Sequence, residues 1–238
     1  MIKGKNNVFI DGQPVVELYY DKTDPTKVVG AGYKPSDQAE VIGNAAPKLT
    51  GGLHNNLRYK DFSLSFLIDY KWGGDIWAGD RIASLMAGLS PETLVERDGG
   101  GLPYTYPSGE TANHGVILEG VLEDGIPNTH VVHYLYKYGR NGWSMGLYPQ
   151  TDGIIENTWV KMREIAVSWN FPAGLVAKTK IFRGLSVSLV GRDLFYLYSS
   201  LPDRINPEGT NGTTNAQGLM FGALPGQRSY GFTIRAIF

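Results

Sequence analysis

The chain has 238 residues and a nearly balanced charge, with 22 Lys and Arg against 23 Asp and Glu, and it contains no cysteine. The charge balance argues against a nucleic-acid partner, because binding to phosphates needs a surplus of positive charge. The lack of cysteine excludes disulfides, thiolate metal sites and cysteine nucleophiles. Glycine is frequent, at 31 residues, aromatic residues make up 12% and charged residues only 19%, which favours an all-β protein with many turns.

Five segments alternate between apolar and polar residues, as a β-strand with one apolar and one polar face does. The strongest is 62–72, where Phe62, Phe66 and Trp72 share the apolar side and Ser63 lies opposite. A weaker alternation precedes it, and three clear ones follow later in the chain. In chain order, the predicted strands cover about residues 48–59, 62–72, 158–171, 183–195 and 229–238.

The long segment 73–157 contains one predicted helix. Ile82 and Leu85 belong to an apolar series at helical spacing, Asp75 is placed to cap its start, and Gly88 suits its end. A second helical start follows at Ser90, with proline in the first helical position. The longer helix could dock a partner protein, although packing onto neighbouring structure is the simpler interpretation.

Aromatic residues also recur in this long segment, and they are the best candidates for ligand contact. Aromatic rings stack on the apolar faces of sugars, and tyrosine adds a hydroxyl group for hydrogen bonding. The alternation at residues 132–138 could equally be a short strand packed on neighbouring loops. The candidate contacts are Tyr104, Tyr106, Tyr134, Tyr136, Tyr138, Trp143 and Tyr148.

Patterns for catalysis and metal binding are weak throughout. His130 and His133 lack the four-residue spacing and the intervening glutamate of a zinc protease, and Glu123 begins only an ordinary acidic turn. No serine lies in a nucleophile elbow. We therefore expect no enzymatic activity, no metal and no cofactor.

The alternation alone does not say which face of the sheet is buried. A soluble β-sandwich would bury the apolar face, but three features favour a membrane barrel instead. The connections are short at one end of the strands and long at the other, at 73–157 and 196–228, as in outer-membrane barrels. Aromatic residues gather at the strand ends, where the two lipid–water interfaces would lie. Ten strand residues tilted by about 45° span about 24 Å, close to the apolar band of such a barrel.

Four segments resemble motifs of the SusC/RagA family of TonB-dependent outer-membrane transporters, in its C-terminal part. The chain carries VIGNAAPK at 41–48, LRYKDFSLSF at 57–66 followed by GGDI, WVKMREIAVSW at 159–169, and GRDLF at 191–195 followed by NPE. These are similar to the family's IGNPNPK, YKDFSLS…GGDI, FLRLRNISLSY and GRNLF…DPE elements. Asp193 and Asn206 depart from the commoner letters, and Lys161 and Met162 stand at the Arg and Leu places.

The resemblance implies a 22-stranded barrel with an N-terminal plug, energised through TonB and lidded by a SusD-like lipoprotein, that imports glycan oligomers or peptides. The present chain would then be an all-β, antiparallel transmembrane β-barrel segment in the bacterial outer membrane, comprising the last five strands. The long extracellular loops would contain short helices, and residues 1–47 would be the remainder of another loop. Because five strands cannot close such a barrel, we expect a fragment of a longer polypeptide; the alternative is a separate chain that supplies the plug and other strands.

The same resemblance suggests roles for residues of the strands. The barrel-assembly machinery would read a C-terminal signal that includes Tyr230, Phe232 and Phe238. Four charged residues would face the lumen and bond mainly to the plug: Arg58, Glu164, Arg192 and Arg235. The alternative function is that of a soluble or surface-attached β-sandwich that binds carbohydrate through its aromatic loops.

Overall fold

The computed structural model describes residues 1–138, 151–210 and 218–238. The chain divides into two compact units, each assembled from segments distant in sequence. Unit 1 comprises Met1–Ala45, Asp75–Ile155 and Thr210–Ala223, and unit 2 comprises Ala46–Gly74, Glu156–Gly209 and Leu224–Phe238.

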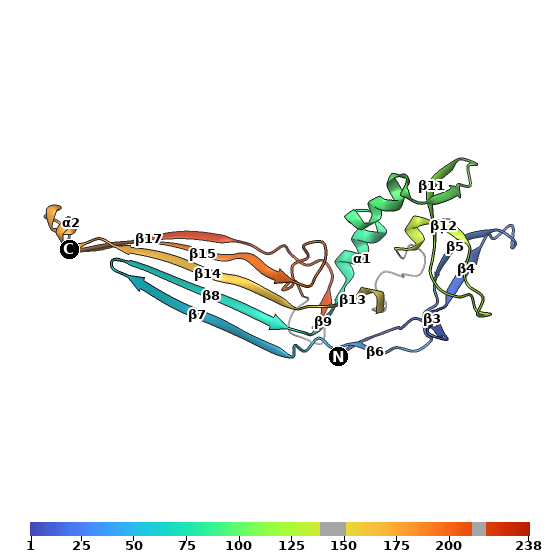
Figure 1. Ribbon diagram of the computed structural model, residues 1–238, viewed down its shortest axis with the longest axis horizontal. Helices are drawn as coiled ribbons and strands as arrows, with labels where there is room; N and C mark the ends of the chain where they lie inside the picture. Colours follow the sequence, from blue (N-terminus) through green and yellow to red (C-terminus); the bar gives the residue numbers. More distant parts are fainter. Residues whose placement is uncertain (139–150, 211–217) are drawn as a thin grey trace. The chain divides into compact units, whose positions relative to one another are not determined.

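Unit 2 is built on five long antiparallel strands in the order β17-β15-β14-β8-β7 (Figure 1). The sheet is open, with β7 and β17 at its edges. Four strands begin and end within about a residue of the predicted ranges, whereas β15 continues four residues beyond its predicted end at 195. The strands are β7 (Leu49–Tyr59), β8 (Phe62–Trp72), β14 (Trp159–Asn170), β15 (Gly184–Ser199) and β17 (Ser229–Ile237).

Short connections join these strands at one end of the sheet. Lys60, in the two-residue turn between β7 and β8, takes a positive φ of 53°. The short helix α2 (Ala173–Lys178) lies between β14 and β15.

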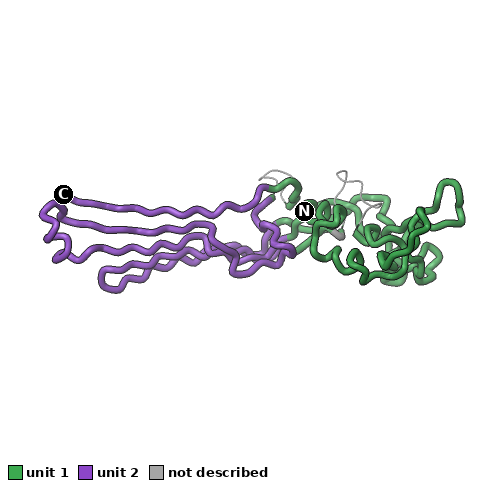
Figure 2. Tube along the Cα trace, turned by 90° about the horizontal axis from the view of Figure 1, so that it is seen from above, with its two compact units in different colours: residues 1–45, 75–155, 210–223 green, residues 46–74, 156–209, 224–238 purple. Residues whose placement is uncertain are grey.

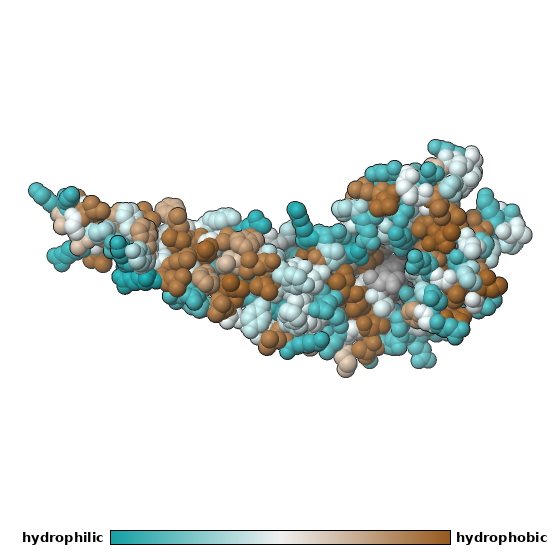
Figure 3. All heavy atoms as spheres, viewed as in Figure 1, coloured by the Kyte–Doolittle hydropathy of each residue, from teal (hydrophilic) through white to brown (hydrophobic). Residues whose placement is uncertain are grey.

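The strand registers place the apolar residues of all five strands on one face. Leu64 of β8 pairs with Val167, which pairs in turn with Leu189, and Phe232 lies beside Leu189 at the sheet edge. The apolar face is open, since Leu189 is 61% and Phe232 73% exposed. The strands of unit 2 lie in one layer (Figure 2), and hydrophobic side chains are visible over them in Figure 3.

Unit 2 has almost no hydrophobic core of its own. Among its described residues the buried hydrophobic side chains are Trp159, Val176 and Leu201. A single-layer sheet with one open apolar face cannot gain enough hydrophobic stabilisation in water, because burial of apolar area supplies most of the favourable free energy of folding. The exposed face of this sheet therefore needs a cover of lipid or of protein.

Aromatic residues lie at both ends of the apolar face, with aliphatic residues between them. At the short-turn end Phe62 stacks on Trp169, with ring centroids 5.7 Å apart and planes 5° from parallel, and Tyr59 pairs with Phe62. At the opposite end β8 finishes with Tyr70 and Trp72. This distribution matches the aromatic girdles at the two interfaces of an outer-membrane barrel.

Unit 1 contains short strands, most of them in segments that the sequence predicted as loops. Its first 45 residues, expected to be the remainder of a loop, form strands β1 to β6. The turn between β2 and β3 is Asp11-Gly12, with φ of 49° and 79°, a dipeptide typical of tight hairpins that our prediction overlooked. The strands are β1 (Ile2–Gly4), β2 (Phe9–Ile10), β3 (Gln13–Pro14), β4 (Val16–Tyr20), β5 (Val28–Tyr33), β6 (Glu40–Gly43), β9 (Asp75–Ala78), β10 (Leu102–Thr105), β11 (Thr111–Ile117), β12 (Val131–His133), β13 (Ile154–Glu156) and β16 (Leu219–Met220).

The predicted helix of the long segment exists as α1 (Gly79–Met86), but its cap differs from the prediction. Asp75 lies in β9, and its carboxylate accepts a hydrogen bond from the Asn44 amide at 2.7 Å instead. Gly88 ends the helix as predicted, because its φ of +69° suits glycine and its amide donates to the Leu85 carbonyl at 3.0 Å. Helical turns follow at η1 (Pro91–Thr93), η2 (Glu96–Gly100), η3 (Tyr134–Tyr136) and η4 (Thr151–Gly153).

The core of unit 1 joins the hairpin of β4 and β5 to the sheet of β10, β11 and β12. Val16, Ala31, Leu118 and Val132 are each at most 2% exposed and form one cluster. No helix among the described residues is long and apolar enough to cross a membrane.

Candidate functional site

The polar face of the unit 2 sheet carries a bulge that gathers charged residues. In β14 the pairing with both neighbouring strands shifts register between Met162 and Glu164, so Arg163 has no paired residue on either side. The extra residue lets Arg163 lie on the same face as Lys161 and Glu164. A strict alternation of faces cannot do this, because neighbours in a regular strand point to opposite sides.

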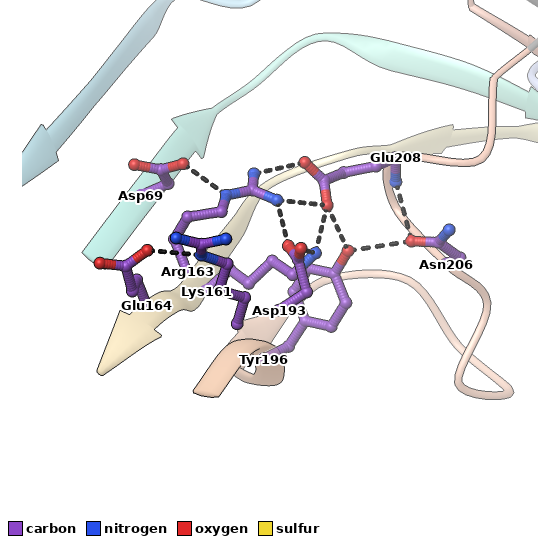
Figure 4. Close-up of polar contacts among 9 residues, drawn as sticks. Asp69, Lys161, Arg163, Glu164, Asp193, Tyr196, Asn206 and Glu208 are labelled. Carbon is purple, nitrogen blue, oxygen red and sulfur yellow. Dashed lines mark hydrogen bonds and ion pairs between the residues drawn. The ribbon is translucent and has the colours of Figure 1, made fainter. Parts of the chain in front are cut away.

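Arg163 binds three carboxylates from three different parts of the unit (Figure 4). Its Nε lies 2.7 Å from Oδ2 of Asp69 in β8, its Nη1 2.5 Å from Oδ1 of Asp193 in β15, and its Nη2 2.5 Å from Oε1 of Glu208. The planar guanidinium group can bond in several directions at once. Arg163 therefore fastens the segment after β15 to two strands of the sheet.

Lys161 and Tyr196 complete this ionic cluster. The Lys161 side chain is 7% exposed, and its Nζ lies 2.8 Å from Asp193 and 2.5 Å from Glu208. Tyr196 donates from its hydroxyl to Oδ1 of Asn206 at 2.9 Å. Because a buried ammonium group is costly without partners, these carboxylates are what allow Lys161 to lie there.

The two departures from the family motif letters have a structural explanation. Asp193 adopts a φ of +54°, a left-handed conformation that Asp and Asn tolerate better than most residues. Asn206 serves through its side-chain oxygen, which accepts from Tyr196 and from the Glu208 amide. An aspartate at position 206 would offer the same acceptor oxygen, whereas at position 193 the charge of the aspartate also pairs with Lys161 and Arg163.

The pKa of Glu208 lies below its ordinary value. Burial by itself would raise this pKa, but hydrogen bonds from Arg163 and Lys161 outweigh that effect. The side chain is 31% exposed. The carboxylate therefore stays ionised at neutral pH and remains able to hold both cations.

Protonating Glu208 should weaken the unit 2 structure at acidic pH. A carboxyl group with a lowered pKa in the folded state contributes stability above its unfolded pKa, and this contribution is lost as pH falls through the folded pKa. We expect Glu208→Gln to cost about 1–2 kcal/mol at pH 7 and the difference from the native protein to shrink toward pH 3. Urea unfolding of both proteins in lipid vesicles, measured from pH 7 to pH 3, checks this, and a difference that stays constant with pH would contradict it.

The four charged residues predicted to face the lumen all lie on the polar face of the sheet. Glu164 pairs with Arg192 across β14 and β15, and the two form an ion pair of 2.7 Å. Arg58 pairs with Ser63, and Arg235 pairs with Ser186. These registers place the four residues on one face, opposite the apolar residues.

Unit 1 contains a pocket of about 560 Å³ that includes several of the predicted aromatic residues. This volume is typical of sites for small molecules. Tyr104, Tyr106 and Tyr136 line it. The other lining residues are Lys27, Val28, Val29, Pro103, Thr105, Pro107, Val131 and His133.

Ring contacts fix the aromatic wall of this pocket. Tyr104 meets Tyr106 edge to face, with centroids 5.2 Å apart, and lies 5.4 Å from the ring of His133. Tyr136 lies directly against Gly30, where a Cβ atom would collide with its ring. The lack of a side chain at Gly30 therefore gives this tyrosine its place.

A chain of hydrogen bonds orients the Tyr106 hydroxyl. The Leu135 amide donates to Nδ1 of His133 at 3.3 Å, so in a neutral His133 the proton is on Nε2, which donates to the Tyr106 oxygen at 3.3 Å. Tyr106 in turn donates to Nδ1 of His114 at 2.5 Å. The pattern thus assigns one tautomer to each histidine. Burial, followed by the nearby Tyr134 and Glu110, raises the pKa of Tyr106, so its hydroxyl proton is retained at neutral pH.

Two other predicted ligand contacts, Tyr134 and Tyr138, do not line the pocket. Tyr134 and Tyr138 are 8% and 7% exposed and pack with Leu85. The interpretation of residues 132–138 as one strand is wrong, because β12 ends at His133 and a helical turn follows. Tyr138 donates to Oε2 of Glu96 at 3.2 Å. Trp143 and Tyr148 lie outside the described residues.

The residues of the predicted assembly signal are all accessible. Tyr230, Phe232 and Phe238 are 74%, 73% and 73% exposed. Phe238 contacts the ring of Phe182, with centroids 5.2 Å apart.

In the described part of the chain, no three His, Asp or Glu residues form a group that could hold a metal ion.

No protein-family profile matches the sequence, and no curated protein sequence matches it. Similar folds occur in solved structures of the RagAB peptide importer. The structure in its closed-closed state matches with a TM-score of 0.50 and 15% identity, over 98% of this chain and 22% of that chain. The RagAB peptide transporter matches with a TM-score of 0.51 and 15% identity over the same shares. The open-open state matches with a TM-score of 0.51 and 14% identity, over 99% of this chain and 22% of that chain.

The chain thus spans 22% of the length of the RagAB chains that it matches. At this level of identity the likeness establishes a shared fold. It relates the open sheet of unit 2 and the short strands of unit 1 to the fold of part of those chains.

Proposed function

We propose that this chain forms wall strands and outer loops of a TonB-dependent importer in the bacterial outer membrane. The observation that carries the proposal is the apolar face of the unit 2 sheet, which is open along all five strands and ends in aromatic residues on both sides. Lipid is the cover that suits such a face, because its acyl chains meet the aliphatic residues and its headgroup regions meet the aromatic rings. The fold shared with RagAB chains supports the same conclusion.

The polar face suits the interior of such a barrel. Charged residues are tolerated there because the lumen is filled by water or by a plug, and the ionic cluster around Arg163 needs that surrounding. In this proposal the ionic cluster holds the segment after β15 against the inner wall. The plug would be contacted by Arg58, Glu164, Arg192 and Arg235. A SusD-like lipoprotein would close over the outer loops and contact α1.

Peptides are the cargo that we propose first, and glycan oligomers second. The solved structures with a shared fold are described as a peptide importer and a peptide transporter, which supports this order. The chain would contribute to transport and not to catalysis. The alternative, a soluble carbohydrate-binding sandwich, requires a second sheet over the apolar face, and the described residues of unit 2 supply none.

The terminal aromatic residue offers a direct test of the membrane proposal. In cells that express the intact parent protein, we expect Phe238→Ala to lower the amount of folded, heat-modifiable protein in the outer membrane severalfold, because the assembly machinery would lose its signal. The control is Phe182→Ala, which removes the ring contact with Phe238 but keeps the terminal residue. Equal amounts of folded protein for the native chain and Phe238→Ala would argue against a role in assembly.

Behaviour without detergent tests the proposal more broadly. We expect the protein to require detergent or lipid to stay folded and monomeric, and cells that contain it to take up labelled peptides. A protein that remains folded and monomeric in plain buffer would exclude the transporter proposal and favour the sandwich.

A further inference from the structure

The pocket of unit 1 has a charge bias that points to a class of ligand. Among the described residues that line it, Lys27 is the cation and none is acidic. Lys27 is exposed and takes part in none of the ion pairs found in the described part of the chain. Its ammonium group is therefore available to an anion that enters the pocket.

The carboxylates nearest in sequence are held mainly by hydrogen bonds of their own turn, and the charge of Lys27 is the smallest of the effects on the pKa of either one. Asp21 accepts hydrogen bonds from the hydroxyl and the amide of Thr23 at 2.6 and 2.7 Å. Asp24 accepts from the hydroxyl and the amide of Thr26 at 2.6 and 3.0 Å. Both carboxylates are thus bound into the turn that precedes Lys27, and neither lines the pocket.

The rest of the pocket suits a flat or apolar group attached to the anion. Tyr104, Tyr106 and Tyr136 present rings, and Pro103 and Pro107 add apolar surface. The wall is set in advance, because Tyr136 lies on Gly30 and the other two tyrosines contact each other. A preformed site loses less conformational entropy when the ligand binds.

The hydrogen bonds among Tyr106, His114 and His133 occupy these groups, so Lys27 is the group that would recognise the charge of a ligand. The one hydroxyl hydrogen of Tyr106 is used by His114, and Nε2 of His133 is directed at Tyr106. Neither group can donate to a ligand without giving up an existing bond. A charged ligand group would therefore bind at the lysine, at the edge of the aromatic wall.

We propose that this pocket binds a carboxylate-bearing ligand, with the carboxylate at Lys27 and the adjoining apolar or ring-shaped group between Tyr104 and Tyr136. The inference rests on the proposed import function, since it specifies the chemistry of the cargo. Two sources share this chemistry: the free C-terminus of a short peptide and a uronic acid of an oligosaccharide. The pocket volume admits one or two residues or sugar rings.

The test measures binding by calorimetry to the intact parent protein in detergent. The probes are the tetrapeptide Ala-Ala-Pro-Tyr with a free C-terminus, the same peptide with a C-terminal amide, digalacturonic acid, and lactose as the uncharged disaccharide. We expect Lys27→Met to weaken binding of the carboxylate probe about fivefold, the effect of one partly exposed ion pair, and to leave the amide and lactose unaffected. The control is Lys22→Met, which changes the same charge on the same turn outside the pocket.

Each outcome decides between support and rejection. The inference is supported if the native protein binds the free peptide acid more tightly than the amide, or digalacturonic acid more tightly than lactose, and if this preference is lost in Lys27→Met but kept in Lys22→Met. The acid that is preferred then identifies the source of the carboxylate. Equal binding of acid and amide forms and of the two disaccharides, or equal effects of both lysine variants, would overturn it. Peptide uptake by cells is measured separately. If cells take up peptide but the protein shows no preference for carboxylate probes, this inference is rejected and the proposed import function is unaffected.

Discussion

Replacing Arg163 with alanine should lower the free energy of unfolding of the intact protein by about 3 kcal/mol. The change removes the one group that contacts Asp69, Asp193 and Glu208 together. Asp193 and Glu208 would then share Lys161, and Asp69 would lose the cation that it pairs with. Partly buried charges that lose their partner destabilise a fold strongly. Urea unfolding in lipid vesicles, followed by tryptophan fluorescence, measures the loss.

A matched control for this variant lies on the same face of the sheet. The side chain of Arg192 is 62% exposed, and among the described residues it forms one ion pair, with Glu164. Exposed pairs of this kind contribute under about 1 kcal/mol, so Arg192→Ala should have a small effect. Similar losses for Arg163→Ala and Arg192→Ala would show that the ionic cluster has no special role in stability.

Placing a charge on the apolar face should be as damaging as removing Arg163. Ile165 lies in the middle of the apolar face, paired with Phe66 on one side and Gly191 on the other. An arginine near the middle of the lipid-facing surface of a barrel costs about 2–4 kcal/mol. We therefore expect Ile165→Arg to lower the free energy of unfolding by that amount and to reduce the folded protein in the membrane.

The neighbouring residue provides the control for this prediction. Ala166 pairs with Ser65 and Val190, on the polar face. Ala166→Arg introduces the same side chain one residue along the same strand, and we expect an effect near the ±0.5 kcal/mol of an ordinary surface substitution. If Ala166→Arg proved the more damaging of the two in vesicles, the assignment of the faces would be reversed.

The aromatic pocket shows which ligand contacts residue type alone can predict. Tyrosines in a long connecting segment suggest ligand contact, and Tyr104, Tyr106 and Tyr136 do line one pocket. The same residue type gives no warning that Tyr134 is buried, because burial depends on which elements pack against it. Lys27 was missed altogether, since it reaches the pocket from a hairpin far away in sequence.

The five strands of unit 2 follow from local chemistry. Alternation of apolar and polar residues with period two marks a strand wherever one face is apolar, so the sequence alone determined their positions and which residues share a face. It also determined the turn at Lys60 and the end of α1 at Gly88, because short-range backbone geometry depends on nearby residues.

Tertiary structure decided what local periodicity cannot encode. The bulge at Arg163 breaks the alternation for one residue, and only pairing with both neighbouring strands shows on which face that residue lies. The ionic cluster joins Asp69, Arg163 and Glu208, which are far apart in sequence, and unit 1 is assembled from three separate segments. Contacts of this kind arise when distant segments meet, because the free energy that fixes them comes from the packed arrangement and not from any one stretch of the chain.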